Sequence, residues 1–337
     1  MAIAFIRYPS PSQVLVNGLT AAIAKLNSDD DPKPQLVSLP LQRINQPNLT
    51  LFASPVALQL AARWHLPAVE VAEQILAQLP WQAANIPPDQ PGTASLLDFT
   101  IQVTSQGWIN CQLSDSCLAA WLQLMTQFPP LVLERVQSSS SEICLRKPED
   151  ADALPLTAGL EAQESLIFSI QYAHARCCSL IRLAHRQELL QLVDPDQKIS
   201  PLIWEIRAPH PVPWLDCQRR LWLTHPAERI LIARLLDFPA SLSSQKLRRS
   251  WRETFCLSAS ELAVPVSWPF PRHAVWQQAQ AWSKAFEFFY CSCRIWGEVK
   301  VETPDLAGAR LGLILATQAV LQFMLQELLE VPAPLEL

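Results

Sequence analysis

The chain has 337 residues, half of them hydrophobic and 17% charged, so it has room for two folded domains and is too apolar to be disordered. Its formal net charge of −5 argues against avid nucleic-acid binding through charge alone. The 7 glycines form neither G-x-G-x-x-G nor G-x-x-x-x-G-K, which excludes these phosphate-binding loops.

Three helices are predicted in the first part of the chain. Residues 11–26 place apolar side chains at helical spacing. Ser54-Pro55 puts a capping residue and a proline where a second helix begins. A third helix is expected from Pro67 to Leu79.

A β-hairpin follows these helices. Residues 99–104 and 107–113 alternate between apolar and polar side chains around Ser105-Gln106-Gly107. Ser114-Asp115 then caps a helix that extends to about Phe128. We therefore expect an α+β N-terminal domain over residues 1–128.

A linker separates this domain from the rest. Between residues 129 and 162 the periodicity fades, with a serine run at 138–141 and one short strand expected at 131–136. From there to residue 337 the pattern is nearly all helical, so we expect an all-α helical-bundle domain over 163–337. A proline-rich loop, or a hairpin of short strands, interrupts it at 193–217. Its helices are predicted at 164–192, 226–238, 241–256, 272–297 and 305–330.

No metal or cofactor site is expected. The 9 cysteines include no C-x-x-C pair, and Cys291-x-Cys293 has no partner pair and no nearby histidine. Reduced thiols and the lack of a secretory signal predict a cytoplasmic protein. The apolar run from Leu311 to Leu329 is interrupted by glutamines on one side, so we interpret it as a core helix, with no membrane partner.

Two tyrosine–arginine pairs have a spacing that suits RNA. Tyr172 precedes Arg176, and Tyr290 precedes Arg294, each by one helical turn. An aromatic ring stacks on an unpaired base while a guanidinium holds a phosphate. The alternative for Tyr172 and Arg176 is a half-buried tyrosine beside a surface arginine. His174 lies on the apolar side of the same helix, so we expect a hydrogen-bonded core histidine.

A basic cluster provides a further candidate site. The predicted helix at 241–256 carries Lys246, Arg248, Arg249 and Arg252 beside Trp251. This cluster is either a solvated helix face or a phosphate-binding ridge. Overall charge gives little support to the ridge, because residues 1–162 sum to −6 (8 basic, 14 acidic) and residues 163–337 to only +1 (18 basic, 17 acidic).

Several short segments occur in the order found in one known family. The second half of the chain resembles the all-helical DALR anticodon-binding domain of arginyl-tRNA synthetases, which implies a tRNA-binding helical bundle. The segments that carry the resemblance are Gln171-Tyr172-Ala173-His174-Ala175-Arg176, Pro226-Ala227-Glu228-Arg229, Leu236-Asp237-Phe238-Pro239, Ala285-Phe286, Phe288-Phe289-Tyr290, Cys293-Arg294 and Ala309-Arg310-Leu311.

The first half resembles the N-terminal extra domain of bacterial arginyl-tRNA synthetases. The matching segments are Ser54-Pro55-Val56-Ala57, Val71-Ala72 and Gly107-Trp108-Ile109-Asn110. In that family the domain contacts tRNA near its D-loop, which implies an RNA contact at Asn110. The alternative is that Asn110 satisfies the backbone of the hairpin.

Two differences from the family bear on function. Only residues 129–162 lie where a synthetase carries its catalytic domain, and no histidine begins a His-x-Gly-His motif. The chain is therefore expected not to be an enzyme and to have no catalytic residues. Cys291 also replaces an asparagine that often follows the family's tyrosine, which places specific anticodon reading in doubt.

The sequence thus favours a catalytically inactive arginyl-tRNA-synthetase-like protein that binds tRNA or a structured RNA, with no DNA partner. The alternative is a protein–protein interaction or scaffold module that kept the helical bundle and lost RNA binding. The expected RNA-binding residues are Tyr172, Arg176, Tyr290, Arg294, Arg248, Arg249, Arg252 and Asn110. If these residues lie on one exposed face of the structure, RNA binding is favoured over the scaffold alternative.

Overall fold

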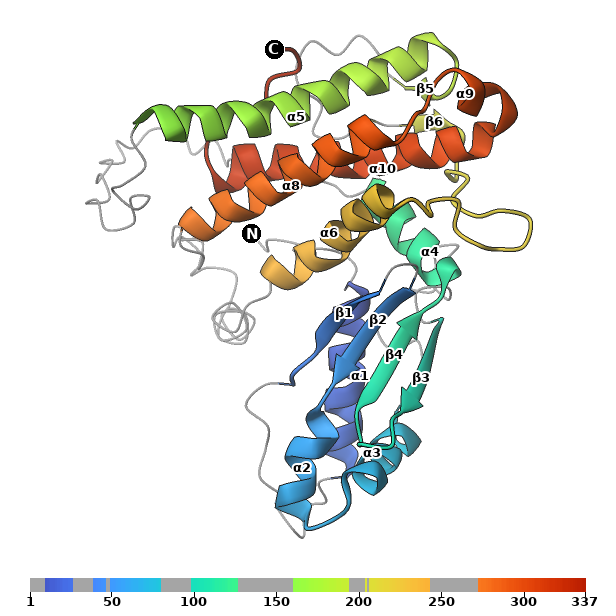
Figure 1. Cartoon of the computed structure of the whole chain (residues 1–337), viewed down its shortest axis with the longest axis vertical. Coiled ribbons are helices and arrows are strands. Elements are labelled where there is room, and N and C mark those ends of the chain that lie inside the picture. Colours follow the sequence, from blue (N-terminus) through green and yellow to red (C-terminus); the bar gives the residue numbers. More distant parts are fainter. Residues whose placement is uncertain are drawn as a thin grey trace, which may run out of the picture. The chain divides into compact units, whose positions relative to one another are not determined.

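A computed structural model describes residues 10–26, 39–46, 49–79, 98–126, 160–193, 204, 206–242 and 272–337. Contacts between residues divide the chain into two compact units. The sheet unit comprises Tyr8–Leu124 and Pro213–Leu242, and the helical unit comprises Met125–Val212 and Ser243–Leu337 together with the first residues of the chain. Each unit is described separately (Figure 1).

The sheet unit is built on a four-stranded antiparallel sheet of order β1-β2-β4-β3. In the strand Ile109–Leu113, buried Ile109, Cys111 and Leu113 alternate with half-buried residues, whereas Phe52, Ala53 and Ser54 of its neighbour are all buried. The strands are β1 (Gln42–Gln46), β2 (Leu49–Ser54), β3 (Phe99–Val103) and β4 (Ile109–Leu113). The helices are α1 (Pro11–Leu26), α2 (Val56–Trp64), α3 (Ala68–Ala77), most of α4 (Asp115–Thr126) and α6 (Pro226–Leu242).

Gly107 closes the turn between β3 and β4. Its φ is +87°, a conformation that costs an L side chain roughly 1–2 kcal/mol. A Cβ added there would lie 2.6 Å from the Cβ of Ala68, at the start of α3. The glycine therefore permits both the turn and the close approach of α3 to the hairpin.

The helical unit consists of long helices that pack along one another. Helix α5 (Leu160–Arg186) contacts both α8 (Arg272–Ser292) and α10 (Pro304–Phe323) (Figure 1). The short helix α9 (Glu298–Glu302) precedes α10, and a π-helical turn at Met324–Leu328 continues α10 at its end. Strands β5 (Gln191–Leu192) and β6 (Ile206–Ala208) form a small antiparallel pair.

Helix α10 is the core element of this unit. Every residue from Leu311 to Phe323 is buried, including Gln318 and Gln322. Among the described helices, Pro304–Gln326 has the length and apolar composition of a membrane span, but 94% of that window is buried within the protein. Gln318 and Gln322 can lie inside the core because they are hydrogen-bonded there, Gln318 to both His174 and Gln322.

The fold class expected from the sequence is confirmed: helices with an antiparallel sheet are followed by a mostly helical region. Helix 11–26, the hairpin and the short strands in the proline-rich segment are also present. The helices predicted at 164–192 and 272–297 are shorter, ending at Arg186 and Ser292. Helix α5 stops because the backbone turns at Glu188, where φ is +60°.

Other expectations differ from the structure or lie outside it. Strands β1 and β2 were not predicted, because the polar segment Gln42–Gln46 has no apolar alternation and is a strand through its pairing with β2. The strand at 131–136 and the helix at 241–256 lie largely outside the described residues. The domain boundaries at 128 and 162 stay a prediction, and by contacts residues 213–242 group with the sheet unit.

Candidate nucleic-acid interface

Helix α5 carries three side chains in a row on one of its faces. Phe168, Tyr172 and Arg176 follow one another at four-residue spacing, so they lie above one another along the helix. Ile170, Cys177 and other apolar residues of α5 are buried, whereas Phe168 is 58% exposed and Tyr172 51%. The helix therefore packs through one side and exposes aromatic rings on another.

The two exposed rings are arranged in parallel. The centroids of Phe168 and Tyr172 are 6.2 Å apart, with an angle of 24° between the ring planes. Phe168 was not among the residues predicted from the sequence. Its position four residues before Tyr172 is the signal that could have identified it. Together the rings form the α5 ring pair.

Arg176 connects α5 to α8. Its Nη2 donates a hydrogen bond to the hydroxyl of Tyr290, and its guanidinium carbon lies 4.7 Å from the centroid of the Tyr290 ring. Closer to the start of both helices, the hydroxyl of Ser283 donates to the carbonyl of Ser169 at 3.0 Å. Two contacts with the same sequence separation of 114 residues show that α5 and α8 run side by side in the same direction.

Tyr290 is supported from inside the helical unit. Its ring stacks on that of Phe286, with centroids 6.3 Å apart and an angle of 19°. Phe286 is 2% exposed and Tyr290 is 37% exposed. Val275, Ala279, Trp282, Phe286 and Phe289 are buried and form the core side of α8. Tyr290 is thus the exposed end of an aromatic column that starts in the core.

A neighbouring side of α5 holds the segment Val331–Leu337. Gln171 Nε2 donates to the carbonyl of Pro332 at 2.8 Å, and Arg182 Nη2 donates to that of Leu335 at 2.8 Å. The guanidinium of Arg182 also pairs with the carboxylate of Glu336 at 3.1 Å. These contacts attach the segment Val331–Leu337 to α5.

His174 is the buried centre of this attachment, as expected of a core histidine. Its Nδ1 lies 2.9 Å from the carbonyl of Pro334, and its Nε2 lies 3.1 Å from Nε2 of Gln318. A ring that donates from Nδ1 and accepts at Nε2 is neutral and satisfies both partners. Gln318 continues the chain to Gln322 at 2.7 Å. Burial lowers the pKa of His174 to about 4.

The remaining predicted residues do not all belong to this face. Arg294 is exposed just beyond the end of α8, and its carbonyl accepts a hydrogen bond from the guanidinium of Arg310. Asn110 is half-buried in β4 of the sheet unit, between Ala53 and Gln102 in the register. Arg248, Arg249 and Arg252 lie outside the described residues. The structure therefore brings together Tyr172, Arg176 and Tyr290, with Phe168 added.

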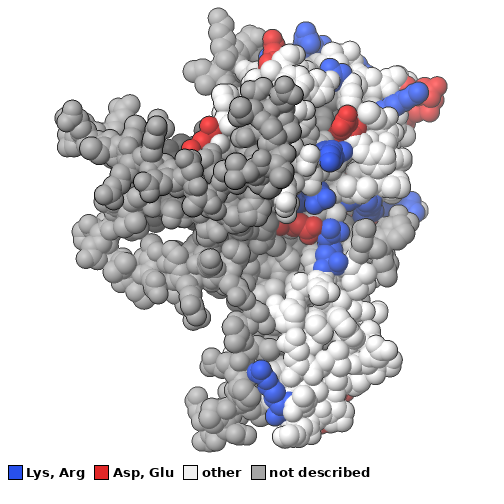
Figure 2. All heavy atoms as spheres, turned by 60° about the vertical axis from the view of Figure 1, so that its left-hand side comes forward, with Lys and Arg blue, Asp and Glu red and all other residues white. Residues whose placement is uncertain are grey.

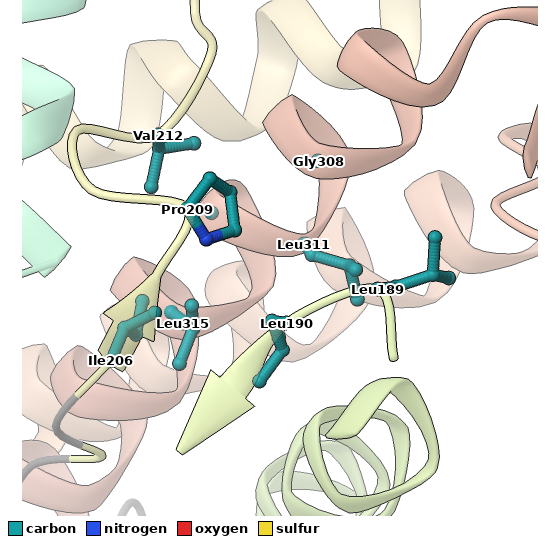
Figure 3. Close-up of a pocket in the computed structure, with 9 residues that line it drawn as sticks. Leu189, Leu190, Ile206, Pro209, Val212, Gly308, Leu311 and Leu315 are labelled. Carbon is teal, nitrogen blue, oxygen red and sulfur yellow. The ribbon is translucent and has the colours of Figure 1, made fainter. Parts of the chain in front are cut away.

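Neither the charges nor the pocket described in Figures 2 and 3 marks a ligand site by itself. On the face drawn in Figure 2, the described basic side chains are interspersed with acidic ones. Figure 3 shows a pocket beside α10 whose free space of about 10 Å³ holds no more than one water. Its lining is apolar and includes Leu190, Pro209 and Leu311. Within the described residues, no group of three or more His, Cys, Asp or Glu side chains could hold a metal.

The chain matches one known domain family and a group of curated relatives. Residues 170–337 match the DALR anticodon binding domain. The arginine–tRNA ligase of Synechococcus sp. (strain JA-3-3Ab) is 31% identical over 165 residues, which are 49% of this chain and 21% of that protein. The arginine–tRNA ligase of Salinibacter ruber is 28% identical over 162 residues, 48% of this chain and 20% of that protein.

The similarity is thus confined to part of the relatives. The chain spans about a fifth of the length of the ligases it matches. No solved structure shows significant similarity to it. The C-terminal region contains a DALR anticodon-binding domain related to that of arginyl-tRNA synthetases, which includes α8, α10 and the part of α5 from Ile170 onward.

Proposed function

We propose that this protein binds tRNA or another structured RNA through α5 and α8 and does not aminoacylate it. The observation that carries the proposal is the exposed group of Tyr172 and Tyr290, joined by Arg176 within a DALR anticodon-binding domain, with Phe168 stacked on Tyr172 just before the matched residues. Such domains suggest tRNA binding in general, and this group supplies the chemistry for it.

Exposed rings are suited to unpaired bases. A base stacked on an aromatic side chain contributes about 1–3 kcal/mol to binding. The charge of α5 is also compatible with an anion: its two glutamates lie in the first turns, and residues 165–186 contain three arginines and no acidic residue. One of these, Arg182, is paired with Glu336. A polyanion that presents unpaired bases, such as a tRNA loop, complements both properties.

The first test measures binding of total tRNA to the full chain by fluorescence anisotropy. We expect binding at about 50 mM salt that weakens toward about 200 mM, because released counterions drive phosphate binding. Phe168→Leu and Tyr172→Leu, which keep apolar bulk and remove the ring, should each weaken binding by about 5- to 150-fold. No binding at low salt would refute the proposal and favour the scaffold alternative.

Phe288→Leu is the matched control for these ring variants. Phe288 is also exposed, at 47%. It lies two positions before Tyr290, about 200° around α8 from the proposed face. We expect its loss to leave tRNA affinity unchanged. An equal effect of Phe288→Leu would indicate that the aromatic face has been assigned wrongly.

Catalysis is tested separately. The absence of a His-x-Gly-His motif supports the proposal that this chain does not activate arginine. We therefore expect no arginine-dependent exchange of pyrophosphate into ATP, with or without tRNA. Measurable exchange would refute the non-enzymatic part of the proposal. A second RNA contact at Asn110, as in the N-terminal domain that the first half resembles, belongs to the same proposal.

A further inference from the structure

Resting on the proposed function, we infer that Arg176 is a positioning residue, which holds the ring of Tyr290 for RNA and does not itself bind a phosphate. Its contacts with that ring, together, are called the Arg176–Tyr290 brace. One contact is the hydrogen bond to the Tyr290 hydroxyl, and the other is the guanidinium lying 4.7 Å from the ring centroid.

One edge of the Arg176 guanidinium is unavailable to a phosphate. A guanidinium binds an oxyanion most strongly through two parallel N–H groups on one edge. On the edge formed by Nε and Nη2, Nη2 already donates to Tyr290, and Nε is inaccessible to solvent without a hydrogen-bond partner among the described residues. The guanidinium carbon lies over the ring of Tyr290. That edge is therefore closed to a bidentate phosphate contact.

The Arg176–Tyr290 brace adds a second contact that holds the exposed ring of Tyr290. Tyr290 stacks on buried Phe286 and also contacts Arg176 of α5. The ring of Tyr290 is contacted by Arg176, which is 114 residues away in sequence, and Tyr290 is still 37% exposed. A ring ordered before binding loses less conformational entropy when a base stacks on it.

Lysine cannot replace arginine in such an arrangement. The guanidinium is planar and combines a directed hydrogen bond with contact across a ring, whereas an ammonium is a compact, strongly hydrated charge. Arg176→Lys therefore removes the brace and retains the positive charge. The opposite change is Tyr290→Phe, which removes the hydroxyl partner and retains every charge.

The binding test uses the full chain and fluorescently labelled total tRNA. We expect Arg176→Lys and Tyr290→Phe each to weaken tRNA binding. The double variant should lose no more affinity than whichever single variant binds tRNA less tightly. We also expect all three to keep the wild-type dependence of affinity on salt. A phosphate ligand would behave differently: its loss in Arg176→Ala would reduce the slope of log K against log salt by about 0.7, which is about 2.6-fold in relative affinity over a fourfold change in salt.

A second measurement needs no RNA. The chain has only 3 tyrosines, so 3-fluorotyrosine labelling yields a ¹⁹F NMR spectrum that the Tyr290→Phe variant assigns. We expect Arg176→Lys to shift or broaden the Tyr290 resonance and to leave that of Tyr8 unchanged. Wild-type circular dichroism of the variant serves as the folding control.

The outcomes separate the two proposals. If wild type binds tRNA but Arg176→Lys binds equally well and Arg176→Ala has a smaller salt slope, Arg176 is a phosphate ligand and the brace is overturned. An unchanged Tyr290 resonance in Arg176→Lys overturns it as well. If wild type binds no tRNA at low salt, the proposed function fails and the role inferred for Arg176 in RNA binding fails with it.

Discussion

Acidification is expected to weaken the helical unit through one residue, His174. This ring is fully buried, and its neutral form satisfies the carbonyl of Pro334 on one side and the amide of Gln318 on the other. A second ring proton would face the donating amide of Gln318 and add a charge in the core. Protonation should therefore favour the unfolded chain, where water solvates the imidazolium.

The size of the effect follows from the two pKa values. The folded-state pKa is about 4, below the ordinary value of 6.5. The unfolded chain thus takes up a proton as the pH falls through 6.5, and the folded protein does so only near 4. The stabilisation of the fold by neutral His174 is fully present above pH 6.5 and is lost progressively as the pH falls from 6.5 to 4. At pH 5 the loss is about 2 kcal/mol.

Urea unfolding at pH 7 and pH 5 measures this loss. The control variant is His174→Gln, which cannot take up a proton and whose amide can still donate to Pro334. The other 5 histidines are present in both proteins, so their contribution cancels in the comparison. We expect wild type to lose about 2 kcal/mol more than the variant on acidification.

An equal loss in both proteins would refute this reasoning. Such a result would mean that His174 is protonated in the fold at ordinary pH or is reached by water at little cost. Histidine ¹H NMR of the folded protein would then show the His174 resonance titrating near 6.5 instead of near 4.

The other predictions concern local packing and reactivity. Gly107→Ala should lower the free energy of unfolding by about 2–4 kcal/mol in urea titrations, because it adds backbone strain and a steric overlap. Gly297→Ala, whose φ is also positive but whose Cβ would meet open space, should lose only about 1–2 kcal/mol, so equal losses would contradict the packing argument. Cys291 is exposed and should react with a maleimide in the native protein, whereas buried Cys177, whose pKa burial raises, should react only after unfolding, as read by mass spectrometry. Glu336→Gln should cost less than about 1 kcal/mol in thermal unfolding, because the carboxylate is 78% exposed, and a larger loss would show that the ion pair is better shielded than its geometry indicates.

Local periodicity was a good guide wherever a segment buries one side. The helix at 11–26 and the hairpin at 99–113 have regular apolar spacing, and both are present. Strand β1 was missed for the opposite reason. Its residues are polar, and the partner that makes it a strand is β2, which no pattern within Gln42–Gln46 reveals.

In the candidate site, too, local spacing predicted some features, whereas contacts between distant residues could not be predicted. Spacing of four residues placed Tyr172 and Arg176 on one side of a helix, and the same rule includes Phe168. It also separated His174 from them as a core residue. Spacing could not show that Arg176 contacts Tyr290, because that contact joins residues 114 positions apart.

The sequence by itself determined the 11–26 helix, the hairpin, the α+β and all-α order, and the placement of Tyr172 and Arg176 on one side of α5. These depend on the period at which apolar side chains recur, which is a local property. Only the tertiary structure decided that the guanidinium of Arg176 is occupied by a ring and that Val331–Leu337 is held on α5. Those facts depend on how separate helices pack, and packing is decided by side chains that are distant in sequence.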